Sequence, residues 1–515
     1  MPHNAATPAM INPMRLRPAK SLIIPMSFCA IVLSLGWLAR SFEYDTDEGL
    51  NLMKSLLMLR GHRLYSEIWS DQPPLFTYLL AWLFKWTGPG VMVGRMLVLA
   101  FSALLLWSLY QTLSILEDQR YALWATLLLA GSTWYALFSF SVMIGLPALS
   151  LAMVSIWLMA EFRRRGHSRL PAILLPALAG SAAAMSMQTK LFTAAAMPLL
   201  AAVCVAPLGD QMPKLSRRRR YVALAVTAAS AALSFALIAC VTRIDLQQLT
   251  RSHVEASTAD ISQGDQGLSL VPRAWTLLRR DWHLVVLMLI GLSVGTASGH
   301  ARTGPGARSR WRVWLPMVWF AVAAVALQIH RPVWKHHGLL LTIPASWAAA
   351  RGLLWLRDAA WPKSDAYPAP ADPTRRRWLV AAGIALSCWL VYAAIRGAVR
   401  LFDRQADSGY AMVNILQSHA PMTRWVYADR VMAPFRAGLS VPPALAVVST
   451  KRQRAGELDD RMLLEVLQQY RPEQVIIGRL SYGPAFMQYL ESHYRRGYST
   501  APPVLQTHYL RNDLP

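Results

Sequence analysis

The chain has 515 residues, 54% of them hydrophobic, and its mean hydropathy is positive. A water-soluble protein of this length would not need such a composition. The net charge of +24 would fit a nucleic-acid binder, but Lys and Arg occur in short clusters between apolar runs, as in loops that orient membrane helices. We therefore expect an integral membrane protein without a nucleic-acid partner.

Apolar runs of membrane-spanning length recur along the chain. A spanning helix needs about 20 apolar residues, and this length predicts about eleven transmembrane helices. The first run follows Arg15, Arg17 and Lys20 and is longer than the apolar part of a cleaved signal peptide, so we expect it to be retained. The predicted spans are 21–39, 91–112, 121–139, 142–160, 170–188, 191–208, 221–241, 283–299, 313–329, 338–356 and 378–395.

Basic clusters predict the orientation of these spans. Short loops rich in Lys and Arg stay in the cytoplasm, and such loops alternate here with connections that carry few charges. A cytoplasmic N-terminus satisfies this pattern, and the odd number of spans then places the C-terminus outside. The clusters assigned to cytoplasmic loops lie at 163–169, 214–220, 302–312 and 375–377.

Three outer segments, 40–90, 242–282 and 396–515, are too long to be simple connectors. Loops beyond roughly 12–15 residues are usually functional or separately folded, so any chemistry should face outward. The last segment shows strand, helix and strand patterns at 425–429, 458–470 and 474–478, which predict a small α/β unit.

The expected fold is an α-helical polytopic membrane protein, with juxtamembrane helices on its outer face and a small C-terminal α/β domain. Residues 1–395 would form the transmembrane part, including the first outer loop at 40–90. Residues 396–515 would form the domain outside the cytoplasm.

The first outer loop carries two helical patterns. From about Asp47 to Arg60 the apolar residues recur in helical register, and Gly61 stands where a C-terminal cap is expected. Such a helix between two spans would lie along the membrane surface. The run from Tyr78 to Trp86 predicts another juxtamembrane helix.

Three carboxylates, Asp45, Asp47 and Glu48, stand at the start of the first of these helices. Asp45 and Glu48 have the spacing of a capping box, and acids favour helix N-termini. The functional alternative is a general base at the membrane surface that deprotonates a hydroxyl attacking a lipid-borne substrate. Spacing favours capping without separating the two interpretations.

The first outer loop also resembles a known pattern. One string of residues is similar to the first-loop pattern of the polyprenyl-phosphate-dependent membrane glycosyltransferases of the C-type superfamily. That superfamily includes the protein O-mannosyltransferases and the lipid A aminoarabinose transferases. The matching string is Asp47-Glu48-Gly49, Leu59-Arg60-Gly61, Leu64-Tyr65, Gln72-Pro73-Pro74-Leu75 and Arg95. Later features are similar as well: Lys190 between two apolar spans, and His336-His337 before Pro344.

The resemblance implies an inverting sugar transfer with Asp47 as the base. Lys190 and Arg95 would then hold the leaving phosphate of the donor, because cations stabilise charge as it develops. His336 and His337 would contact that phosphate or a metal ion. Each basic residue has a structural alternative: Lys190 as an interfacial charge, Arg95 paired with a loop carboxylate, and the two histidines as an interfacial pair whose side chains diverge by about 100°.

The chain departs from the family pattern at two places. The aminoarabinose branch carries Lys before the Pro-Pro pair, where this chain has Gln72. A second acid near the outer end of the fourth span is replaced by Ile144-Gly145-Leu146-Pro147. Asp45 could substitute for that acid, and whether a divalent metal ion is a cofactor stays open.

These features favour an inverting glycosyltransferase that moves a sugar from a polyprenyl-phosphate donor to an acceptor hydroxyl outside the membrane. The acceptor would be a glycolipid, a polysaccharide or a protein, and the family implies a bacterial inner membrane with membrane lipid around the site. A transporter or flippase of lipid-linked sugars is the alternative, although it would place charges or broken helices midway through spans. A non-catalytic scaffold is the third possibility.

Overall fold

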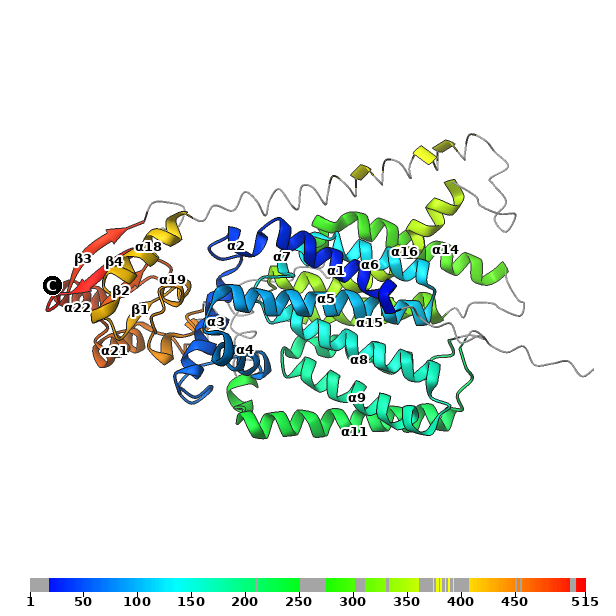
Figure 1. Cartoon of the computed structure of the whole chain (residues 1–515), viewed down its shortest axis with the longest axis horizontal. Helices are drawn as coiled ribbons and strands as arrows, with labels where there is room; N and C mark the ends of the chain where they lie inside the picture. Colours follow the sequence, from blue (N-terminus) through cyan, green and yellow to red (C-terminus); the bar gives the residue numbers. More distant parts are fainter. Residues whose placement is uncertain are drawn as a thin grey trace, which may run out of the picture.

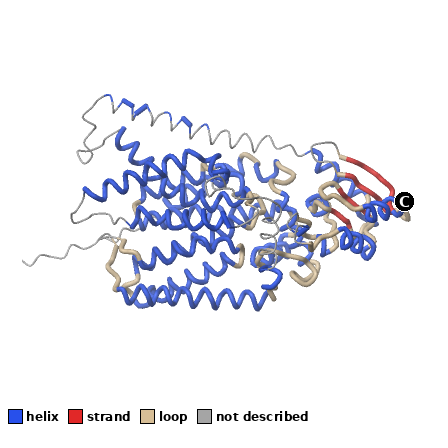
Figure 2. The backbone as a smooth tube through the Cα atoms, turned by 180° about the vertical axis from the view of Figure 1, so that it is seen from behind, coloured by secondary structure: helices blue, strands red, loops and turns tan. Residues whose placement is uncertain are grey.

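The computed structural model describes residues 18–208, 212–250, 275–301, 311–329, 333–360, 407–449, 452–453, 456–500 and 506–515, with scattered residues between 374 and 392. Its elements form a helical bundle at one end of the long axis and a small sheet at the other (Figure 1). The same two parts are seen from behind in Figure 2, with the strands gathered next to the C-terminus.

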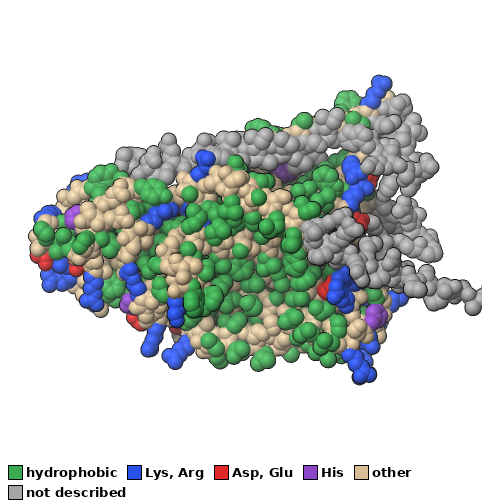
Figure 3. Space-filling view, in the orientation of Figure 1, with side chains coloured by type: hydrophobic (Ala, Val, Ile, Leu, Met, Phe, Trp, Pro, Cys, Tyr) green, Lys and Arg blue, Asp and Glu red, His purple; other side chains and the backbone are tan. Residues whose placement is uncertain are grey.

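Six helices in the described part of the chain are long and apolar enough to cross a membrane. They run alongside one another, and hydrophobic side chains cover most of the visible face over them, with Lys and Arg gathered toward the two ends (Figure 3). The chain is therefore an integral membrane protein. The six are α5 (Val91–Leu116), α8 (Gly145–Arg165), α9 (Arg169–Met187), α11 (Arg217–Thr242), α15 (Trp311–Ile329) and α16 (Gly338–Ala360).

The other predicted spans that the structure describes are occupied by shorter elements and by α14, whose 20 residues match the length of a span. The last predicted span, 378–395, lies mostly outside the described residues, so the number eleven stays a prediction. The run 121–139 is interrupted between two helices, where Ser132 has extended backbone before the second helix. The shorter elements are α1 (Pro18–Ser34), α2 (Trp37–Arg40), α6 (Gln119–Ala130), α7 (Thr133–Phe138), η1 (Leu191–Ala196), α10 (Met197–Val205), η2 (Arg279–Asp281) and η3 (Lys335–His337), and α14 comprises Trp282–Ala301.

The first outer loop folds into α3 (Thr46–Leu59) and α4 (Leu75–Thr87), which lie between the bundle and the sheet (Figure 1). Both predicted helices are confirmed. Gly61 adopts φ +95°, its N–H donates to the Met58 carbonyl, and the next N–H donates to the Leu57 carbonyl. This is the glycine-terminated helix end that the sequence predicts.

The C-terminal segment contains a four-stranded sheet in the order β1-β2-β4-β3. β1 pairs in parallel with β2, and the other two pairings are antiparallel. The two predicted strands and the predicted helix are confirmed, whereas their separation as a domain of residues 396–515 stays a prediction. The elements are α18 (Asp407–Ser418), η4 (Ala420–Met422), β1 (Val426–Ala428), α19 (Met432–Arg436), η5 (Pro443–Leu445), α21 (Asp460–Tyr470), β2 (Gln474–Ile477), α22 (Pro484–His493), β3 (Tyr494–Ser499) and β4 (Thr507–Arg511).

The C-terminal segment lies directly against α3. A Cβ atom added to Gly49 of α3 would stand only 3.0 Å from the backbone nitrogen of Met432 in α19, so the two helices meet at a position without a side chain. At the other end of α3, Arg60 donates a hydrogen bond of 2.8 Å to the Gly438 carbonyl. The sheet is thereby fixed relative to the loop that carries the three acids.

Candidate active site

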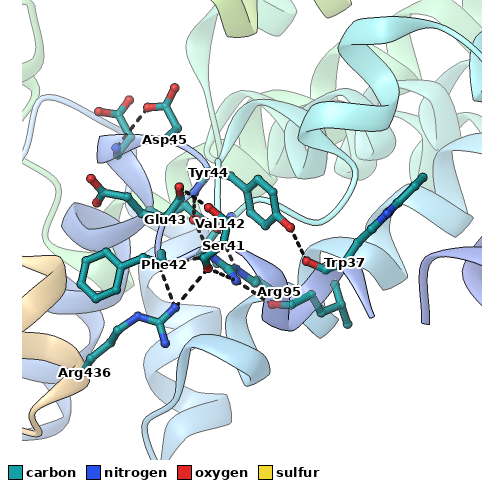
Figure 4. Close-up of polar contacts among 12 residues, drawn as sticks. Trp37, Ser41, Phe42, Glu43, Tyr44, Asp45, Arg95, Val142 and Arg436 are labelled. Carbon is teal, nitrogen blue, oxygen red and sulfur yellow. Dashed lines mark hydrogen bonds and ion pairs between the residues drawn. The ribbon is translucent and has the colours of Figure 1, made fainter. Parts of the chain in front are cut away.

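The three acids at the start of α3 do different things. Asp45 is the N-cap, and its carboxylate accepts the Asp47 N–H at 3.2 Å. Glu48 does not return a bond to Asp45, as a capping box would require, but accepts the Tyr44 N–H at 2.6 Å. The carboxylates of Glu43 and Asp45 lie on one side of this turn, away from the network around Tyr44 (Figure 4).

Glu48 and Arg95 form a buried ion pair at 2.8 Å, with side chains 0% and 1% exposed. Glu48 also accepts the Val142 N–H at 2.8 Å, while Arg95 donates to the carbonyls of Leu38 and Ser41 at 2.6 and 3.0 Å (Figure 4). The pair joins α3 to α5 and to the segment before α8. This pairing of Arg95 with a loop carboxylate is the structural alternative given in the sequence analysis. The Glu48 carboxylate and the Arg95 guanidinium bond to each other and to backbone groups.

Asp47, the neighbour of Glu48, is oriented differently and belongs to a half-buried cluster of charges. Its pKa is raised to about 6, first by burial and then by the negative charge of Asp45, while Lys190 lowers it. Asp71 and Arg479 also act on it, in opposite directions. A carboxylate with this pKa is ionised at neutral pH and can still take up a proton, as a general base must.

Lys190 lies in a buried polar pair with His336. Its Nζ is 2.8 Å from Nε2 of His336, and it stands just before η1, in the turn between two apolar helices. The adjacent His337 faces another partner, because its Nδ1 accepts the backbone N–H of Trp334 at 3.1 Å. The structure thus pairs Lys190 with His336, and the Lys190 charge acts on Asp47, while His337 accepts a hydrogen bond within its own turn.

Lys54 is a site residue that sequence reasoning missed. It lies seven residues after Asp47 on α3, hence on the same face, and is only 3% exposed. Burial lowers the pKa of its ammonium group, and the charges of Asp71 and Asp47 oppose that shift. A single Lys in an amphipathic helix ordinarily faces solvent. The sequence pattern therefore gave no sign that this lysine is buried.

Glu43 and Arg430 were also missed. The Arg430 Nη1 lies 3.6 Å from the Glu43 Oε1, and the two residues come from opposite ends of the chain. Burial raises the pKa of Glu43 to about 7, and Arg430 opposes that shift. No local pattern could have paired them.

The structure was also searched for residues that could hold a metal ion, as predicted for His336 and His337. In the part of the chain that the structure describes, no three His, Cys, Asp or Glu side chains are grouped as metal ligands. A divalent metal cofactor therefore stays a prediction, and no step below depends on it.

Comparisons with known proteins give a structural likeness without a sequence match. No family model matches the chain, and no curated protein matches it. ArnT from Cupriavidus metallidurans, solved with undecaprenyl phosphate, is similar with a TM-score of 0.60 and 12% identity, over 95% of this chain and 98% of that one. The oligosaccharyltransferase AglB from Archaeoglobus fulgidus was solved with an inhibitory peptide and a dolichol-phosphate. It is similar with a TM-score of 0.54 and 13% sequence identity, over 97% of this chain and 75% of that one.

A third similar structure is the arabinofuranosyltransferase AftD from Mycobacteria, with a TM-score of 0.52 and 12% identity over 96% of this chain and 40% of that one. At such identities the likeness concerns the fold, which extends here over nearly the whole chain. The chain therefore has the fold of the C-type membrane glycosyltransferases.

Proposed function

We propose that this chain is an inverting glycosyltransferase that moves a sugar from a polyprenyl-phosphate donor to an acceptor hydroxyl on the outer face of the membrane. The observation that carries the proposal is the buried pair of Lys190 and His336, with Nζ and Nε2 2.8 Å apart, whose lysine charge acts on the half-buried Asp47 carboxylate. The fold supports it, because ArnT and AglB were solved with undecaprenyl phosphate and dolichol-phosphate.

The proposed reaction is a single displacement. Asp47 takes the proton of the acceptor hydroxyl, and the hydroxyl oxygen forms a bond to the anomeric carbon of the sugar. The bond from that carbon to the phosphate oxygen breaks, and polyprenyl phosphate leaves with the electron pair. Lys190 would stabilise the negative charge that grows on the phosphate, since a fixed cation is most effective where charge develops. His336, whose Nε2 lies 2.8 Å from the Lys190 Nζ, would hold that group in place. Attack from the face opposite the phosphate inverts the anomeric configuration.

Transfer should depend on pH through Asp47. The base acts in its ionised form, and its pKa is raised to about 6, so activity should fall as the pH is lowered through about 6 and level off above about 7. The measurement is the initial rate of transfer from a labelled polyprenyl-phosphate sugar across this range. A rate that stays constant down to about pH 5 would rule out Asp47 as the titrating base.

The phosphate-binding role is tested with Lys190→Met in membranes supplied with radiolabelled polyprenyl-phosphate sugars. We expect transfer to fall about 100-fold or more, because the variant loses a buried cation beside the leaving group. Lys85→Met, at an exposed lysine in the last turn of α4, is the matched control and should transfer at the wild-type rate. Equal rates for Lys190→Met and the wild type would leave Lys190 as an interfacial charge.

A further inference from the structure

One face of α3 carries polar residues that are buried. With 3.6 residues per turn, positions i, i+4 and i+7 of a helix share one face, and in α3 these positions hold Asp47, Asn51 and Lys54. Lys54 is 3% exposed and Asn51 5%, while Asp47 is half-buried. A helix at a membrane surface ordinarily keeps its polar face in water. The polar face of α3, formed by these three residues, instead faces the protein interior.

Hydrogen bonds fix the surroundings of this polar face. The Nδ2 of Asn51 donates to the Val142 carbonyl at 2.9 Å, in the segment before α8. α3 packs against α4, whose first residue, Leu75, donates its N–H to the Gln188 carbonyl at 3.0 Å. Gln188 stands two residues before Lys190, in the same turn. The polar face therefore belongs to the packed unit that also holds the turn of Lys190.

Lys54 has no direct partner on this face. In the part of the chain that the structure describes, its ammonium group donates no hydrogen bond and forms no salt bridge. The charges of Asp71 and Asp47 act on it without contact. A buried charge without a hydrogen bond is costly, and a native protein that keeps one usually has a functional reason for it. The ammonium group is therefore suited to bind a group from outside the chain.

The Asp47 carboxylate, at the other end of the polar face, is in a similar state. Its backbone N–H bonds to Asp45, but its side chain accepts no hydrogen bond from any residue that the structure describes. Seven helical residues place the Cα atoms of Asp47 and Lys54 about 10 Å apart. A substrate that spans this length can place a hydroxyl at the carboxylate and an anionic group at the ammonium.

Phosphate is the anionic group that the surroundings of Lys54 favour. A lysine binds phosphate as a compact point charge that needs no fixed planar geometry. α3 belongs to the loop between the helical bundle and the sheet (Figure 1), and lipid-borne phosphates lie at the membrane surface. The proposed donor carries such a phosphate, and an envelope glycolipid acceptor can carry one as well.

We propose that Lys54 is a substrate-binding residue whose ammonium group binds a phosphate of a lipid-borne substrate, while Asp47 faces the reacting hydroxyl. The phosphate comes either from the acceptor, which then spans the polar face, or from the polyprenyl donor, which Lys54 and Lys190 then hold together. The inference rests on the proposed function in taking Asp47 as the base. A lysine that only balances the charges of Asp71 and Asp47 would stabilise the loop without any preference for phosphate.

The test is equilibrium binding to the full-length protein in detergent, which requires no sugar transfer. The radiolabelled probes are undecaprenyl phosphate with undecaprenol as its uncharged counterpart, and extracted envelope glycolipids that are either intact or dephosphorylated. Lys54→Met should raise the Kd of a phosphorylated probe about tenfold or more, because a charge-assisted hydrogen bond is lost, and leave the Kd of its phosphate-free counterpart unchanged. Lys54→Arg should bind close to the wild type, as should Lys85→Met at an exposed lysine of α4.

The pattern of the losses identifies the source of the phosphate. Weaker binding of undecaprenyl phosphate assigns Lys54 to the donor, and weaker binding of the intact glycolipid assigns it to the acceptor. If Lys54→Met has a lowered thermal unfolding midpoint, Lys54→Gln, which keeps a hydrogen-bond donor without the charge, takes its place. Wild-type affinity for both phosphorylated probes, or an equal loss for the phosphate-free ones, would overturn the inference. A selective loss of phosphate binding in a protein that transfers no sugar would instead overturn the proposed function alone.

Discussion

Asp47→Asn should lower the rate of sugar transfer by a factor of about 10²–10⁴, the usual contribution of a general base. The amide has nearly the shape of the carboxylate but cannot accept the proton of the acceptor hydroxyl. The helix start should survive, because Asp45 supplies the N-cap and Asp47 contributes its backbone N–H to it. The measurement is the initial rate of transfer in membranes with matched amounts of inserted protein.

Two variants in the same loop are controls for this loss. Glu67→Gln changes an exposed carboxylate that pairs with His62 and should transfer at the wild-type rate. Asp45→Asn keeps a good capping residue and removes a negative charge beside Asp47, so the acid limb of the pH profile should move to lower pH. If Asp47→Asn transfers at the wild-type rate, Asp47 is no more than part of the helix start.

Arg95→Met should destabilise the folded protein by about 3–5 kcal/mol, because it leaves the Glu48 carboxylate buried without its partner. Glu48→Gln should also destabilise, since the Arg95 charge then stays buried without an opposite charge beside it. The measurement is the thermal unfolding midpoint in detergent, together with the yield of inserted protein.

A double substitution separates the structural role of this pair from a role in catalysis. Replacing both Glu48 and Arg95 by Leu should cost less stability than either single change, because no buried charge is left uncompensated. Asp47→Asn, one residue away, should leave the unfolding midpoint close to that of the wild type. Normal stability of Arg95→Met with a specific loss of transfer would return Arg95 to the phosphate site.

Structural features that depend on neighbouring residues could be predicted from the sequence. The end of α3 at Gly61 follows from backbone sterics, since glycine takes the positive φ that a helix end often needs. The strands β1 and β2 follow from short apolar runs, whereas β3 was missed. Its residues are mostly exposed and it carries Arg495 and Arg496, so no apolar alternation marks it.

The different roles of the loop acids could not be predicted from the sequence. Asp47 and Glu48 are adjacent, and successive residues on a helix point about 100° apart. The two side chains therefore have different surroundings, and only one of them, Glu48, points into the helix bundle. Which one does so depends on Arg95 and on the N–H of Val142, both distant in the sequence. Spacing therefore identified the acids without assigning their roles.

The charges around Asp47 were missed for the same reason. Lys54 and Asp71 belong to the same loop, but only the packing of α3 and α4 buries the lysine close to the acids. Arg430 pairs with Glu43, and the charge of Arg479 acts on Asp47, because the C-terminal segment packs against α3. Such contacts join segments that no single window of sequence contains.

The most direct test of the glycosyltransferase proposal follows a doubly labelled undecaprenyl-phosphate sugar in proteoliposomes that contain the purified protein and extracted envelope glycolipids as acceptor. We predict that the sugar label moves to the glycolipid fraction while free undecaprenyl phosphate appears in equal amount, and that Asp47→Asn slows both by a factor of about 10²–10⁴. Movement of the intact donor between leaflets, with no separation of the two labels, would contradict the transferase and establish the transporter.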